Sequence, residues 1–279
     1  MLSRWQVTTL GIAVCLVTGF VALVVCRAAS DVSLDLAIAT GATGDVRADL
    51  AARSSFGLVW LPFDRDWPAE AARRGQPQIA LLLLAHGGSA GDALEAAAQY
   101  GKWPVAAAVL ATRYRIERSA LRFCLWRAMA ARRHDIVSAL LGRGLPADTA
   151  QSGEPAICAA AFIGDTESIK LLHKYGASAS SVTRSGESAL MACTAGSVSE
   201  SFGVSAQNQI AAARLLLSLG ASAAARDRSG HTALQRALRQ YGAAPGMGAA
   251  KEAPSEFLQP RRAAEYAGWK RHRAKRGDG

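Results

Sequence analysis

Apolar residues along most of this chain recur at intervals of three and four, which is the spacing of one helix face. In residues 153–178, Ile157, Ala160 and Ala161 form one such face, and the stretch "SIKLLH" forms a second face after a Gly-Asp pair. Gly164 and Gly176 follow the two apolar stretches, where a helix commonly ends with a positive φ. The pattern predicts a unit of two short helices joined by a tight turn.

The same unit recurs along the chain. "GEPAICAAA", "GESALMACT" and "GHTALQRAL" begin at Gly153, Gly186 and Gly230, which are separated by 33 residues and then by 44, or 33 plus an insertion of 11. With each start as position zero, an apolar residue stands at plus four: Leu94, Leu125, Ile157, Leu190 and Leu234. A small residue stands at plus seven: Ala71, Ala97, Ala128, Ala160, Cys193 and Ala237. One such unit cannot bury its apolar face alone, so the copies must stack.

These phrases resemble the ankyrin repeat, a unit of about 33 residues in which a β-turn precedes two antiparallel helices. "GHTALQRA" is the copy most similar to the family's T-P-L-H-x-A phrase, although Ala189 and Ala233 replace the proline. The resemblance covers residues 64–243 and implies an all-α ankyrin repeat solenoid with short β-turn fingers. Residues 30–63 are interpreted as a degenerate repeat or an N-terminal cap.

Composition agrees with this fold class and adds a charge. Half of the 279 residues are hydrophobic but only 6% are aromatic, so the core is built mainly from alanine and leucine, which favour helices. The formal net charge is +10 with a pI near 9.8. Such a surface prefers acidic proteins, anionic lipid or nucleic acid, and charge alone does not choose among them.

An uncharged segment begins the chain. Residues 5–26 lie between Arg4 and Arg27, and a helix of this length covers about 30 Å, the thickness of a bilayer's hydrocarbon core. We expect residues 1–29 to form a single-pass transmembrane anchor, with a cleaved signal peptide ending near Ala28-Ala29-Ser30 as the alternative. The N-terminal amine favours a cytoplasmic N-terminus and a repeat domain on the outer side. Ala, Arg and Gly usage suggests a high-GC bacterium, whose outer compartment is the periplasm.

Two other segments interrupt or follow the repeats. Residues 244–279 carry eight Lys and Arg against four acidic residues, and they are interpreted as a basic flexible tail. Residues 197–209 contain the insertion and predict a polar surface loop between the two helices of one repeat. Such a loop either contributes to binding or is a tolerated lengthening of the chain.

The sequence contains no pattern typical of catalysis. None of the histidines pairs with another histidine or a cysteine at metal-ligand spacing, and no nucleophile elbow, phosphate-binding loop or dinucleotide fingerprint occurs. We therefore expect no enzyme activity, no catalytic residue, no metal and no cofactor. Cys124, Cys158 and Cys193 lie in predicted first helices and are interpreted as buried thiols.

The predicted function is a membrane-tethered, non-enzymatic scaffold that binds an acidic protein partner on its concave face. The resemblance implies the scaffold role and the concave face, the segment 5–26 predicts the tether, and the excess of Lys and Arg predicts an acidic partner. Nucleic acid and small-molecule substrates are not expected partners. The alternative is an anion-binding adaptor that uses the tail and the basic repeats to engage lipid headgroups or nucleic acid. The candidate contacts are Arg113, Arg115, Arg118 and Arg122, the finger residues Thr183, Arg184, Arg226, Asp227 and Arg228, and the insertion residues Ser201 and Phe202.

Overall fold

The computed structural model describes residues 31–55, 66–195 and 205–242. The chain divides into two compact units, Met1–Ala120 (unit 1) and Leu121–Gly279 (unit 2). The expected membrane segment 5–26, the tail 244–279 and residues 196–204 of the insertion lie outside the described residues. Among the helices that the described ranges form, none is both long and apolar enough to cross a membrane.

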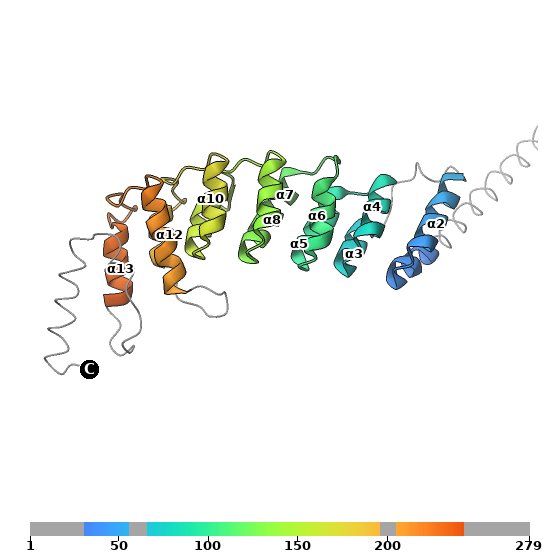
Figure 1. Ribbon diagram of the computed structural model, residues 1–279, viewed down its shortest axis with the longest axis horizontal. Helices are drawn as coiled ribbons and strands as arrows, with labels where there is room; N and C mark the ends of the chain where they lie inside the picture. The colour runs from blue at the N-terminus through green and yellow to red at the C-terminus, as the bar shows by residue number, and fades with distance from the viewer. Residues whose placement is uncertain (1–30, 56–65, 196–204, 243–279) are drawn as a thin grey trace, which may run out of the picture. The chain divides into compact units, whose positions relative to one another are not determined.

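Unit 1 consists of helix pairs. A helix over residues 31–40 is followed by α2 (Thr43–Ser55), and then come α3 (Trp67–Arg74) with α4 (Pro77–Ala85) and α5 (Ala90–Gln99) with α6 (Trp103–Ala111). The first helices α3 and α5 pack against each other, as do the second helices α4 and α6 (Figure 1). Two layers of short helices result, as the repeat pattern predicts.

Unit 2 by itself has the same two-layer arrangement, with added turns. It contains α7 (Arg118–Ala130), whose first residues belong to unit 1, then α8 (His134–Gly142), β1 (Ala150–Gln151), β2 (Glu154–Pro155), α9 (Ala156–Phe162), α10 (Thr166–Lys174), α11 (Ala189–Ala195), α12 (Ala206–Ser218) and α13 (Ala233–Gly242). The first helices α9, α11 and α13 pack against one another in order. The second helices α8, α10 and α12 form the other layer and lie side by side in Figure 1.

The repeated small and apolar positions make the core. Every residue of the plus-seven column, Ala71, Ala97, Ala128, Ala160, Cys193 and Ala237, is 0% exposed. The plus-four residues are equally buried except Leu234 in α13, which is partly exposed. First helices therefore approach closely where the small column lies, and the leucines and isoleucines fill the space between the two layers.

The turn between the two helices of a repeat requires a positive φ. Gly164, between α9 and α10, has φ 67°, and a Cβ there would lie only 2.9 Å from the backbone of Asn208 in the next repeat. In the repeat that lacks this glycine, Arg132 itself adopts φ 52°. Its guanidinium donates to the Ile163 carbonyl oxygen of the next repeat at 3.1 Å, a contact that helps to offset the strain of this conformation.

The predicted extent of the insertion loop is wrong at its C-terminal end. Helix α12 begins at Ala206, so residues 206–209 form its first turn, and Gln209 is fully buried. The Ser205 hydroxyl accepts a hydrogen bond from the Asn208 amide at 3.1 Å and caps the helix. The polar composition of these residues suggested a loop, but the cap at Ser205 allows the helix to begin before the first apolar residues of the predicted helix.

Candidate functional site

The first of the turns between repeats in unit 2 is a small β-hairpin. Strand β1 pairs with β2 in antiparallel register, Ala150 opposite Pro155 and Gln151 opposite Glu154. The two loop residues, Ser152 and Gly153, both have positive φ, 53° and 85°. This is the geometry of a type I′ turn, whose twist matches that of the paired strands.

The second and third turns share one design, set by the phrases "TRSGE" and "DRSGH". In the second, the Thr183 amide donates to Glu187 O at 2.8 Å and the Gly186 amide donates to Thr183 O at 2.9 Å. In the third, the Asp227 amide donates to His231 O at 3.0 Å and the Gly230 amide donates to Asp227 O at 2.9 Å. We call these turns, with the hairpin 150–155, the fingers.

Thr183 and Asp227 stabilise their own fingers. Thr183 Oγ1 accepts a hydrogen bond from the Glu187 amide at 3.1 Å, and Asp227 Oδ1 accepts from the Ser229 and His231 amides, both at 2.9 Å. The side chain of Asp227 is only 9% exposed. These amides, together with the charges of Arg236 and His231, hold the pKa of Asp227 below its ordinary value. The predicted partner contacts at these two positions are thus already engaged within the chain.

Consecutive fingers touch each other. The Arg184 amide donates to the Gly153 carbonyl oxygen at 2.9 Å, and a Cβ at Gly153 would lie 3.0 Å from the Cβ of Arg184. One repeat further on, a Cβ at Gly186 would lie 3.1 Å from Cγ of Arg228. Each glycine accommodates the arginine of the next finger, so the fingers form a continuous row.

The finger arginines are exposed, and two of them are unpaired. Within the described ranges, the guanidinium groups of Arg184 and Arg228 have no hydrogen bond or ion pair. Arg226 donates from Nη1 to the Gly230 carbonyl oxygen at 2.6 Å and braces the third finger. The charges of Arg184 and Arg228 are therefore not neutralised within the described ranges, and the backbone that carries them is held by the hydrogen bonds of the fingers.

Carboxylates lie where the fingers join the first helices, a feature that the sequence analysis missed. Arg236 of α13 lies 2.7 Å from Glu187 Oε1 and 3.5 Å from Asp227 Oδ2. Glu154 occupies the position equivalent to Glu187, and partial burial, with the nearby charge of Glu187, raises its pKa. The signal in the sequence is a glutamate directly after the finger glycine, matched by an arginine six residues after Gly230.

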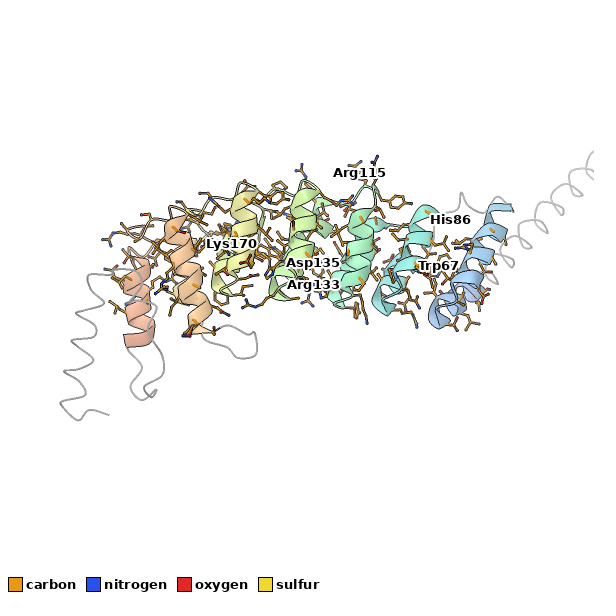
Figure 2. The ribbon with its side chains drawn as sticks, in the orientation of Figure 1. Trp67, His86, Arg115, Arg133, Asp135 and Lys170 are labelled. Atoms are coloured by element: carbon orange, nitrogen blue, oxygen red, sulfur yellow. The ribbon has the colours of Figure 1, made fainter. Side chains whose placement is uncertain are left out.

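The four predicted contact arginines that precede the fingers in the sequence are exposed. Arg113 and Arg115 lie in segment 113–117 of unit 1, which has no regular secondary structure, and Figure 2 shows the side chain of Arg115 directed away from the ribbon. Arg118 and Arg122 lie on α7, four residues apart and therefore on one helix face, and both are exposed. Ser201 and Phe202 lie outside the described residues.

Among the described residues, His134, Asp165 and Ser168 lie close together as a catalytic triad would, but their contacts are structural. His134 Nε2 lies 2.8 Å from Asp165 Oδ1, and the Ser168 hydroxyl donates to Asp165 Oδ2 at 2.6 Å. Ser168 is fully buried and bonds the aspartate rather than the histidine, so the histidine is not placed to activate it. The contact links the start of α8 to the N-cap of α10.

Among the described residues, the cysteines are buried and the possible metal ligands are not grouped. Cys124, Cys158 and Cys193 are buried and free, and burial raises the pKa of the first two to about 12. In the part of the chain that the structure describes, no group of three or more His, Cys, Asp or Glu side chains is placed to hold a metal ion.

Known structures share this architecture. No family model and no curated protein matches the sequence. The ankyrin repeat domain of Bcl-3, a member of the IkappaB protein family, is similar over 81% of this chain and 97% of its own, with a TM-score of 0.62 and 19% identity. An ankyrin repeat domain from Acinetobacter baumannii AYE matches 68% of this chain and 95% of its own, with a TM-score of 0.54 and 20% identity. The predicted all-α ankyrin repeat fold is confirmed.

Proposed function

From this ankyrin repeat fold, we propose that the protein is a non-enzymatic scaffold that is tethered to a membrane and binds an acidic protein partner on the concave face of its repeats. Ankyrin repeat domains are in general protein-interaction modules, and this supports the scaffold role. The specific partner surface is the finger row of unit 2, together with the adjoining first helices.

The row of fingers carries this proposal. One backbone hydrogen bond joins the first two fingers, and the glycines of the first and second fingers lie against the arginine of the next finger. Their exposed side chains are therefore presented without a large loss of entropy on binding. Arg184 and Arg228 have no partner within the described ranges, and that leaves their guanidinium groups available to another molecule. Unit 1 carries exposed arginines of its own, Arg113, Arg115 and Arg118, which are candidate contacts in their own right.

A crosslinking experiment tests the binding surface. A photoreactive amino acid at position 184 or 228 of the full-length chain should capture a protein in the native cell, which mass spectrometry then identifies. The matched control is position 170, because Lys170 is an exposed cation on the second helix α10 and pairs with Glu167 at 2.7 Å (Figure 2). Equal capture from position 170, or no capture from either finger, contradicts the proposed surface.

The acidic character of the partner has its own test. Exposed charges act mainly on the association rate, and salt screens them. The double variant Arg113→Glu with Arg118→Glu should slow association with the captured partner while the thermal stability stays near that of the parent. An unchanged association rate at low salt would remove these arginines from the binding surface.

The tether is tested by topology. A reporter that is active only in the periplasm, fused after Gly279, should be active, and deletion of residues 1–29 should release the protein from the membrane fraction. Activity of a cytosol-specific reporter at the same position would reverse the proposed orientation. N-terminal sequencing of the mature chain distinguishes the anchor from a cleaved signal peptide.

A further inference from the structure

We infer that Arg184 and Arg228 form a two-point site for an acidic peptide in the polyproline II conformation, with carboxylates three residues apart. The inference rests on the proposed function, because it names the kind of segment that a partner would place along the finger row. It follows from the equivalence of the two fingers, the contact between them, and the absence of other charges that pair with these arginines in the described ranges.

The two arginines occupy equivalent positions. Each lies two residues before the glycine of its finger, Gly186 or Gly230, in the turns "TRSG" and "DRSG" with the same hydrogen-bond pattern. Each also packs on the glycine of the preceding finger. The two side chains therefore leave the surface in the same relation to their fingers, one repeat apart.

The spacing favours one ligand conformation. Neighbouring helices pack at about 8–10 Å, so consecutive repeats advance by about that distance along the row. A polyproline II helix has three residues per turn and a rise of about 3.1 Å, which places every third side chain on one face about 9.3 Å apart. A β-strand alternates its side chains with period two, so residues three apart point to opposite faces.

The local electrostatics favour carboxylates at these two points. The carboxylate of Asp227 is held by two backbone amides, and that of Glu187 lies against Arg236, so both are internally compensated. The exposed Arg226 adds positive charge beside the third finger. A partner carboxylate thus meets two unpaired guanidinium groups, each able to donate two parallel hydrogen bonds.

The charged row ends at the first finger. The residue two before Gly153 is Gln151, which is exposed and uncharged, and Glu154 follows the same glycine. Glu154 is exposed and lies near Glu187, and no ion pair neutralises it among the described side chains. A third acidic residue of the ligand would meet a carboxylate here, so the site selects two acidic residues rather than a longer acidic run.

Direct binding of synthetic peptides to the full-length chain in non-ionic detergent tests the inference. The probe is a fluorescently labelled proline-rich peptide with two glutamates separated by two prolines. Companion peptides have one or three prolines between the glutamates, and another has glutamine in place of both glutamates. Arg184→Gln and Arg228→Gln, alone and together, are compared with Lys174→Gln, which removes an exposed cation from the second helix α10.

The two-proline peptide should bind tightest. Exposed ion pairs are weak, so each arginine variant should lower its affinity by about two- to fivefold and the double variant by about tenfold, while Lys174→Gln leaves it unchanged. The double variant should bind this peptide no better than the parent binds the glutamine peptide. Circular dichroism of each variant confirms that the fold is retained.

Different results overturn different claims. Equal binding of all glutamate spacings, with steep salt dependence, indicates a general polyanion surface and overturns the two-point site. The two-point site is also overturned if the affinity for the two-proline peptide does not depend on Arg184 and Arg228. If position 184 still crosslinks to a partner in that case, the proposed function stands. Failure of the crosslinking itself removes the proposed function.

Discussion

Replacing Gly164 by alanine measures how much the contact between successive repeats contributes to stability. Gly164 has φ 67°, and an added Cβ would lie 2.9 Å from the backbone carbonyl carbon of Asn208 and 3.0 Å from the amide nitrogen of Gln209. These atoms belong to α12, whose backbone is fixed by helical hydrogen bonds. The methyl group therefore cannot be accommodated by a side-chain rotation, and the two repeats must move apart.

Gly101 is a matched control for this substitution. It occupies the same position of its own repeat with φ 66°, yet the nearest atom to an added Cβ is Trp103 Nε1 at 3.9 Å. The left-handed conformation costs alanine about 1–2 kcal/mol at either site. Overpacking adds about 1–3 kcal/mol at Gly164 alone, so Gly164→Ala should cost about 2–5 kcal/mol and Gly101→Ala about 1–2 kcal/mol.

Urea unfolding followed by far-ultraviolet circular dichroism measures these losses, and native-state hydrogen exchange locates them. Because repeats are stabilised by their neighbours, exchange should accelerate in α10 and α12 for Gly164→Ala and in α5 and α6 for Gly101→Ala. Equal losses for the two variants would mean that backbone strain accounts for both, and that the close approach to Asn208 contributes nothing.

Other predictions concern the core, the fingers and the thiols. Ala160→Arg places an unpaired charge in a fully buried column and should cost about 3–5 kcal/mol, whereas an unchanged unfolding transition would refute the repeat alignment. Because the pKa of Asp227 is lower in the folded protein than in the unfolded chain, its carboxylate stabilises the fold above the unfolded pKa. This stabilisation is lost as the pH falls through the pKa of the folded state. Asp227→Asn should therefore lower the melting temperature at neutral pH but not in strong acid. A difference that did not depend on pH would assign the effect to shape rather than charge. Cys124 and Cys158 should resist a thiol reagent in the native protein and react on unfolding, and rapid native labelling would contradict their burial.

The basic character of the surface could be predicted, but the role of each charged side chain could not. The phrases "TRSGE" and "DRSGH" identify turns, and all five finger residues looked equally able to contact a partner. In the structure Thr183 and Asp227 accept backbone hydrogen bonds of their own turns, whereas Arg184 and Arg228 are exposed and have no side-chain partner among the described residues. A sequence pattern shows which side chains are polar, whereas their hydrogen bonds depend on backbone geometry that the pattern does not contain.

The sequence by itself determined the repeat, its two-helix unit and its core columns, because a 3.6-residue periodicity and a recurring small residue depend only on local spacing. The tertiary structure decided the pairing of Arg236 with Glu187, the contact of Arg184 and Arg228 with glycines of the preceding fingers, and the early start of α12. The first two join residues of different repeats, and the distances between them follow from how the repeats stack. The early start of α12 follows from the Ser205 cap. In the sequence this cap is a weak local signal beside the polar composition of the stretch. The burial of Gln209, which only the structure shows, places these polar residues in the helix.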